Sequence, residues 1–279
     1  MRTQLLLWGA VAGLLTATSC SKGPEPPRPG TPAFYWNAAK STYHAGDFVK
    51  ANENLQQILQ TENEFTVRAR PWATVLSAGV AQGYAETADE YEAGAKANRA
   101  NPMPFRKDMS ALRTQASAAA LEFTENIHKY IAADKEQEVL LAFESPTGSA
   151  VEPPGLRKIS SGQLVQDSER DALVRAMVQR GFILAAARAT GSPNDPAKLA
   201  ETLKNGEAKT PRPQFLAAMA QELYDRSALF GPTKLDLPNR AQMLCQEALA
   251  ALQAAGPETK ESKALTAKIQ ASLKKLKGT

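Results

Sequence analysis

The sequence FYWNAAKSTYHAGDFVKANENLQQIL, residues 34–59, determines the fold predicted for this chain of 279 residues. Gly46 and Asp47 stand at its centre, where a glycine can end one helix and an aspartate can cap the next. Apolar and small side chains recur at helical spacing on both sides of this pair, so two antiparallel helices can pack closely. The stretch therefore predicts a helical hairpin. Its inward residues are expected to be Tyr35, Ala39, Tyr43, Phe48, Ala51, Leu55, Ile58 and Leu59.

This hairpin resembles a tetratricopeptide repeat, a helix–turn–helix unit of about 34 residues. Tyr35 matches the early aromatic position of that family, Ala39 matches its small residue, and Gly46 matches its turn. Tyr43 lies one position later than the family pattern has it. The resemblance implies an all-α solenoid of stacked antiparallel hairpins, in which the first helix of each repeat lines a concave groove that holds extended peptides.

The rest of the chain carries the same helical punctuation. A weaker second copy of the hairpin is predicted over residues 72–98, and a long helix is predicted from Phe105 onward. The second copy is carried by Leu76, Val80, Gly83-Tyr84, Ala88 and Tyr91. A helix over residues 264–276, apolar on one face and lysine-rich on the other, is expected to close the stack. Other helix ends and starts are marked by glycines, prolines and aspartates at Asp167, Gly191, Asp195, Pro196, Gly206, Pro213, Gly231, Pro238, Gly256 and Gly278.

Residues 144–166 are rich in Pro, Gly and Ser and are too long for an ordinary connection. They divide the predicted helices into an N-terminal subdomain, residues 33–143, and a C-terminal subdomain, residues 167–279. The segment is interpreted either as a linker between the two or as an inserted loop that contacts a partner. The apolar run Val139–Phe143 before it is expected to end the preceding helix, with a short strand as the alternative.

Residues 1–19 have the form of an export signal. Arg2 begins it, and the apolar run 5–15 is shorter than the ~20 residues that a membrane-spanning helix needs. Small residues then precede Cys20. This ending resembles the lipobox of bacterial lipoproteins, although Ala17 stands where that family usually has Leu. The resemblance implies cleavage before Cys20 and acylation of its thiol and new amino terminus; an ordinary cleaved signal peptide is the alternative.

Residues 20–32 are predicted to form a disordered, proline-rich tether. Repeated proline prevents a helix or a central strand, so the segment is expected to be extended and solvated, reaching about 35–40 Å. Ser21 follows the modified cysteine, and in lipoproteins resembling those of enteric bacteria a non-aspartate there permits transfer to the outer membrane. We therefore expect a lipid-anchored protein of the bacterial envelope that faces the periplasm. Its prolines are Pro24, Pro26, Pro27, Pro29 and Pro32.

The charge pattern excludes a nucleic-acid partner. The formal net charge is +4, and six lysines against two glutamates within residues 257–279 account for this excess. A nucleic-acid surface would instead spread basic residues over a folded face. The C-terminal lysines are interpreted as the solvated back of a capping helix, with contact to anionic lipid headgroups as the alternative.

No catalytic or metal-binding pattern stands out in the sequence, so no enzyme activity and no cofactor are predicted. Two histidines and two cysteines leave little material for a multi-histidine metal site or a disulfide scaffold. Glu125 and His128 form one Glu-x-x-His pair, whereas a di-iron bundle needs two. Cys245 is interpreted as a buried small thiol. The carboxylates Glu136, Glu138 and Glu144 give no reason to choose a glycosidase pair.

The candidate site is the outward face of the first helix, where Trp36, Lys40 and His44 project if Tyr35 packs inside. Trp beside basic residues is typical of interface hot spots; the alternative is that Trp36 packs against the next helix. The prediction is a non-catalytic scaffold that binds another envelope protein or a peptide. Alternatives are a helical small-ligand-binding protein, with an enclosed apolar cavity between the halves, an accessory transport subunit, or an enzyme of unrecognised type.

Replacing Cys20 with Ala should remove the acylation site and release the protein from the membrane into the soluble periplasmic fraction, because the remaining sequence offers no other strong anchor. The measurement is fractionation of cells that produce the wild type and the variant. A Cys20→Ala protein that stays in the membrane pellet after a salt wash would contradict the lipid anchor.

Overall fold

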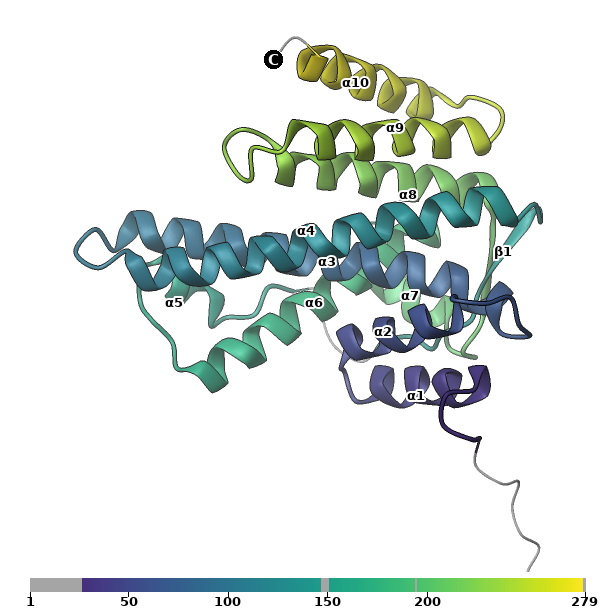
Figure 1. Ribbon diagram of the computed structural model, residues 1–279, viewed down its shortest axis with the longest axis horizontal. Coiled ribbons are helices and arrows are strands. Elements are labelled where there is room, and N and C mark those ends of the chain that lie inside the picture. The colour runs from purple at the N-terminus through teal and green to yellow at the C-terminus, as the bar shows by residue number, and fades with distance from the viewer. Residues whose placement is uncertain (1–26, 147–150, 194, 278–279) are drawn as a thin grey trace, which may run out of the picture.

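The computed structural model describes residues 27–146, 151–193 and 195–277, and this part is mostly helical, which confirms the all-α class (Figure 1). The predicted signal peptide, Cys20 and most of the tether lie outside the described residues. In chain order the elements are α1 (Pro32–His44), α2 (Phe48–Ile58), α3 (Thr66–Ala97), α4 (Met103–Ala133), β1 (Glu138–Leu141), α5 (Leu156–Ser160), α6 (Asp167–Ala189), α7 (Pro196–Thr202), β2 (Ala208–Pro211), α8 (Arg212–Ser227), the short 3₁₀ helix η1 (Ala228–Phe230), α9 (Pro238–Ala254) and α10 (Lys260–Lys277).

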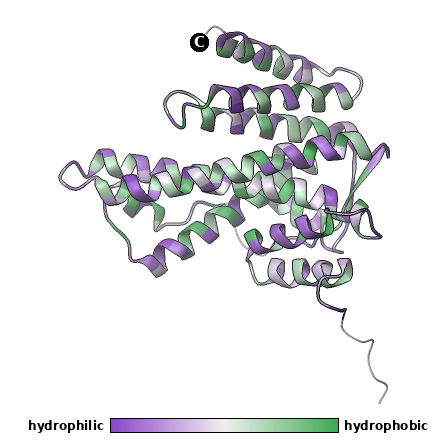
Figure 2. Ribbon diagram, viewed as in Figure 1, coloured by the Kyte–Doolittle hydropathy of each residue, from purple (hydrophilic) through white to green (hydrophobic). Residues whose placement is uncertain are grey.

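The long antiparallel hairpin of α3 and α4 runs through the middle of the molecule (Figure 1). The α1–α2 hairpin packs on one side of it, and α8, α9 and α10 follow one another on the other side. Helix α6 packs along α3. Figure 2 shows polar residues on the outer surface of α10, whose Leu265 and Ile269 are buried towards α9, as the sequence predicts for a capping helix.

The first hairpin forms where the sequence predicts it, but the inner face of α1 is shifted. Gly46 has a φ of 75°, and the Asp47 carboxylate accepts a hydrogen bond of 3.0 Å from the Lys50 backbone N–H. Trp36 is buried on the inner face with Ala39 and Tyr43, whereas Tyr35 is only half-buried. The prediction for Ala39 and Tyr43 is confirmed, whereas the prediction that Tyr35 occupies the inner face was wrong, because Trp36, three residues before Ala39, packs there against Phe65 and Trp72.

The predicted hairpin over residues 72–98 is instead one continuous helix, α3, of 32 residues. Gly83 does not turn the chain, and Gly79 lies one turn before it on the same face. A Cβ atom on Gly79 would lie 2.3 Å from the Phe182 Cα, and one on Gly83 would lie 2.4 Å from the Val178 Cα. Gly181 of α6 likewise has no room for a Cβ, which would lie 2.3 Å from the Gly79 carbonyl oxygen. These glycines let the backbones of α3 and α6 touch.

The run Val139–Phe143 does not extend a helix. Helix α4 ends at Ala133, and β1 pairs antiparallel with β2, with Val139 opposite Thr210 and Leu141 opposite Ala208. The prediction of a helix here was wrong, and the short strand that the sequence left as the alternative is correct. Apolar and β-branched side chains favour this pairing once a distant partner strand is present.

Residues 144–166 contain one short helix, α5, which packs against α3 with Leu156 and Ile159 buried. The hydrophobic core continues across this segment, since Phe182 of α6 lies against Tyr43 and Phe48 of the first hairpin, with ring centroids 5.6 and 5.4 Å apart. The predicted division into two subdomains at residues 144–166 stays a prediction.

Most of the predicted punctuation in the second half is confirmed. Asp195 caps α7 through a 3.0 Å hydrogen bond from the Lys198 backbone N–H, and Gly191, Gly206 and Gly256 have positive φ angles. Asp167 is the first residue of α6, and Gln166 stands at the cap position that the sequence assigned to Asp167. Gly231 does not have the positive φ angle expected of a helix-ending glycine, since its φ is −70°. Gly278 lies outside the described residues.

Replacing Gly79 with Ala should lower the free energy of unfolding by about 2–3 kcal/mol, because the new Cβ must push α6 away from α3. Urea unfolding of purified protein measures this change. The matched control is Gly231→Ala, whose Cβ would meet its nearest atom at 3.3 Å and should cost less than about 1 kcal/mol. Equal stability of the two variants would contradict the close backbone contact.

Candidate functional site

The three residues selected from the sequence, Trp36, Lys40 and His44, line one cavity of about 170 Å³. We call it the α1 pocket. Arg68 and Trp72 of α3 also line it, and two chain segments complete it, the one after β1 and the one before β2. The pocket is thus formed by α1, by α3 and by two further segments that lie far apart in the sequence. The charged groups at this pocket are Lys40, His44, Arg68, Glu144 and Glu207.

Trp36 forms a wall of the α1 pocket and does not project from it. Its ring stacks on Phe65 at a centroid distance of 5.4 Å and meets Trp72 edge-on at 5.5 Å. Only 9% of the residue is exposed. Trp36 thus packs against the neighbouring helix, as the alternative interpretation of the sequence had it, while Lys40 and His44 remain exposed.

Tyr43 fixes the segment after β1 against α1. Its hydroxyl donates a 2.6 Å hydrogen bond to the backbone carbonyl of Glu144, and its ring lies edge-on to Trp72 at 5.3 Å. Burial raises the pKa of the Tyr43 hydroxyl well above its usual range, and the charge of Glu144 raises it further. Tyr43 therefore stays a neutral hydrogen-bond donor.

The basic side chains around the α1 pocket differ in their carboxylate neighbours. Arg68 Nη2 lies 2.8 Å from Glu207 Oε1, and His44 Nε2 lies 3.7 Å from Glu144 Oε1. Lys40 has no ion-pair partner within the described ranges. The indole N–H of Trp72 is buried and also lacks a hydrogen-bond acceptor in the described part of the chain. The pocket thus offers an aromatic wall and an exposed ammonium group.

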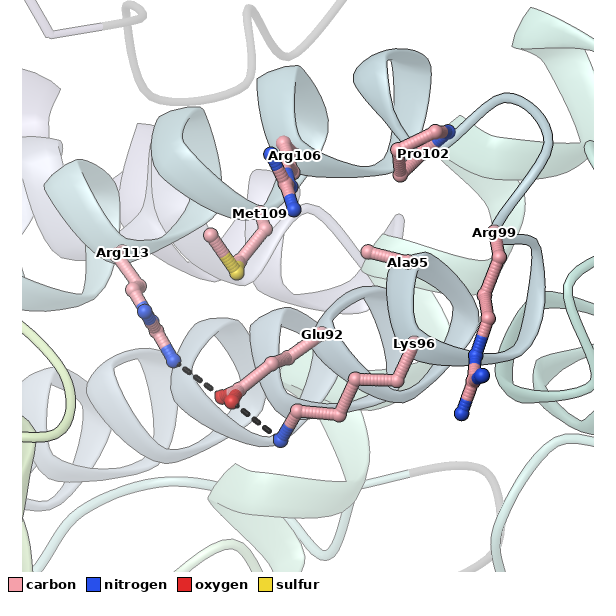
Figure 3. Close-up of a pocket in the computed structure, with 8 residues that line it drawn as sticks. All are labelled: Glu92, Ala95, Lys96, Arg99, Pro102, Arg106, Met109 and Arg113. Carbon is pink, nitrogen blue, oxygen red and sulfur yellow. Dashed lines mark hydrogen bonds and ion pairs between the residues drawn. The ribbon is translucent and has the colours of Figure 1, made fainter.

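A second cavity, of about 530 Å³, lies at the end of the α3–α4 hairpin where the two helices are joined (Figure 3). We call it the basic cleft. None of its residues was selected as a site residue from the sequence. Its basic side chains recur at intervals of three and seven residues, and this spacing could have indicated the site. Its charged members are Glu92, Lys96, Arg99, Arg106 and Arg113.

Glu92 neutralises part of the basic cleft. Its carboxylate lies 2.6 Å from Lys96 Nζ and accepts a 2.6 Å hydrogen bond from Arg113 Nη2, as the dashed lines in Figure 3 show. The hydrogen bond from Lys96 lowers the pKa of Glu92 most, and the positive charge of Arg113 lowers it further. Glu92 is therefore ionised at neutral pH.

The other chemistries that the sequence raised are not assembled among the described residues. Glu125 pairs with Lys129 at 2.6 Å, and His128 Nδ1 lies 3.3 Å from Glu247 Oε2. Cys245 is buried as predicted, and burial raises the pKa of its thiol. Within the described ranges there is no group of three or more His, Cys, Asp or Glu side chains that could hold a metal ion.

The helices of residues 27–146, 151–193 and 195–277 include none that is both long and apolar enough to cross a membrane. Comparison of the chain with protein-family models, with curated proteins and with solved structures finds no match.

Replacing Tyr43 with Phe should cost about 1–2 kcal/mol of unfolding free energy at neutral pH, because the Glu144 carbonyl loses its donor. Because the pKa of Tyr43 is higher in the folded protein than in the unfolded chain, Tyr43 adds to the free energy of unfolding below pH ~10. This contribution is lost as the pH rises above that value. The unfolding free energy of the wild type should thus fall more steeply than that of the variant between about pH 10 and 11.5.

Urea unfolding at several pH values measures both effects. The matched control is Tyr35→Phe, which removes a half-buried hydroxyl without a hydrogen bond in the described structure. Other buried tyrosines titrate equally in all three proteins, so the comparison isolates Tyr43. A Tyr43→Phe protein that matches the Tyr35→Phe control in stability at neutral pH and in its alkaline slope would contradict this role.

Proposed function

We propose that this protein is a lipid-anchored lipoprotein of the bacterial envelope that acts as a non-catalytic helical scaffold, binding an acidic segment of another envelope protein at the α1 pocket. The single observation that carries the proposal is the gathering of Trp36, Lys40 and His44 around one cavity with an aromatic wall. The export signal and Cys20 support the envelope location and the anchor.

The size of the α1 pocket favours a peptide side chain over a whole small molecule. Small-molecule sites usually have volumes of about 300–1,000 Å³, whereas this pocket has about 170 Å³. Such a space accommodates one side chain or one small polar group. A protein segment that inserts a single residue there would bury it against Trp36 and Trp72, which matches the way aromatic anchors act at interfaces.

The charges favour an acidic partner. Arg68 lies 2.8 Å from the Glu207 carboxylate, whereas Lys40 has no carboxylate partner among the described residues, so Lys40 is the cation that remains for a ligand. A partner carboxylate would accept a hydrogen bond from its ammonium group. Charge complementarity of this kind adds to the rate and specificity of association more than to its strength.

The position of the pocket suits a tethered protein. Helix α1, which carries Lys40 and His44, begins at Pro32, where the predicted proline-rich tether ends. The pocket is thus on the first element after the predicted anchor. A partner that is itself held at the membrane would meet this element at a raised effective concentration.

A tetratricopeptide-like stacking of hairpins also belongs to this proposal. The α1–α2 hairpin with its Gly46 turn supports it, and so does the succession of α8, α9 and α10 with a polar-backed last helix. The α3–α4 hairpin, with helices of 32 and 31 residues, departs from the length of such repeats. We therefore place the repeat-like units at the two ends of the body.

A small-ligand-binding function is the second candidate. An apolar cavity of about 500 Å³ between η1, α9 and α10 favours it, with Phe230, Ala241 and Cys245 among its lining residues. The cavity expected from the sequence lies between the N-terminal and C-terminal halves of the chain, whereas this cavity lies within the C-terminal half. A protein partner bound at the α1 pocket would favour the scaffold over this candidate.

A photo-cross-linking amino acid at position 40 of the acylated protein should capture a distinct envelope protein in intact cells, whereas the same amino acid at position 50 should not. Lys50 is an exposed lysine of the neighbouring helix α2, with 61% of its side chain accessible, so it is a matched control. Identical products at both positions, or none at position 40, would contradict the proposal.

The acidic character of the partner is tested by charge reversal. Lys40→Glu should reduce recovery of the captured partner at least about tenfold, and Lys50→Glu should leave it within about twofold. The loss should be smaller at high salt, since an exposed charge pair is screened there. Equal recovery with the two variants would mean that Lys40 does not face the partner.

A further inference from the structure

The basic cleft at the end of the α3–α4 hairpin supports an inference that goes beyond the proposed partner site. Four basic side chains and one carboxylate line it, which leaves an excess of three positive charges. Glu92 holds Lys96 and Arg113. Arg99 and Arg106 have no carboxylate partner in the part of the chain that the structure describes. Clustered like charges repel one another unless an anion joins them.

The side chains come from both helices and from the loop between them (Figure 3). Arg106 extends from α4 into the space between the helices, and Arg99 stands at the loop end. Met109 and Ala95 provide apolar surface between the charged groups. The cleft thus combines cations with an apolar wall, as sites for small organic anions do.

Arg113 forms a buried part of the wall of the basic cleft. The residue is only 6% exposed, and its Nη2 donates a hydrogen bond to Glu92. Its guanidinium group is thus held in place by a carboxylate, while Arg99 and Arg106 remain exposed.

We propose that the basic cleft binds a small phosphorylated compound. The two unpaired guanidinium groups match the charge of a phosphate monoester, about −1.5 to −2 at neutral pH. Arginine also presents a planar fork that binds two phosphate oxygens at once.

The volume of the cleft indicates more than a bare phosphate. About 530 Å³ lies within the range of small-molecule sites, so the phosphate would carry an organic part that lies against Met109 and Ala95. A phospholipid headgroup shares the phosphate chemistry. The assignment is to a soluble compound, and a lipid arm of the experiment separates the two sources.

Titration calorimetry of the purified wild type with inorganic pyrophosphate tests the assignment at low ionic strength. Arg106→Gln should weaken binding at least about tenfold, while Lys107→Gln, the neighbouring exposed lysine outside the cleft, should change it less than about twofold. Arg99→Gln, at an exposed loop position, provides a second variant with the same expected loss. Succinate, a dicarboxylate, should bind at least about tenfold more weakly than pyrophosphate.

Glu92→Gln should act in the opposite direction and strengthen pyrophosphate binding several-fold, because it releases Lys96 and Arg113 for the ligand. A purely structural role of these residues would not produce a gain. No heat of binding at about 1 mM pyrophosphate, or equal losses in Arg106→Gln and Lys107→Gln, would overturn the proposal. Binding of phosphatidate vesicles without binding of pyrophosphate would overturn the assignment to a soluble compound.

Discussion

The contact between α3 and α6 through Gly79, Gly83 and Gly181 is the constraint on which the rest of the structure depends. At these positions there is no space for a Cβ, so the two backbones touch. This contact brings Phe182 of α6 against the aromatic residues of the first hairpin. The two halves of the sequence are thereby joined in one core around α3, whose residues are mostly buried.

The α1 pocket is a consequence of this joining. Once α6 lies along α3, the segments around β1 and β2 are brought beside α1, and Tyr43 fixes one of them through the Glu144 carbonyl. Trp36 and Trp72 close the wall from two different helices. The pocket is thus built from rigid elements and one anchored strand pair, which keeps its donors in place before any partner arrives.

The basic cleft has a different origin. It needs only the α3–α4 hairpin and its loop, because all its lining residues lie between Glu92 and Arg113. The spacing of its arginines along the hairpin places them in the cleft. The Glu92 carboxylate binds two of the basic side chains, Lys96 and Arg113. The α1 pocket is thus built from distant segments, whereas the basic cleft is built locally.

The sequence by itself determined the helices, their caps and the hairpin at Gly46, because these depend on spacing, glycine φ angles and side-chain caps within a few residues. It also selected Lys40 and His44 as members of one site, since they share a face of one helix. It predicted a second hairpin over residues 72–98, where the chain forms one continuous helix, and it placed Tyr35 inside in place of Trp36.

Only the tertiary structure decided these points, for a common physical reason. Whether Gly83 bends the chain or stays helical depends on the backbone of α6, about a hundred residues away. The pairing of β1 with β2 and the partners of Arg68 and His44 depend on similarly distant groups. Local sequence patterns do not indicate which distant segment packs against a given helix. In this protein the segments after β1 and before β2 determine the shape of the α1 pocket.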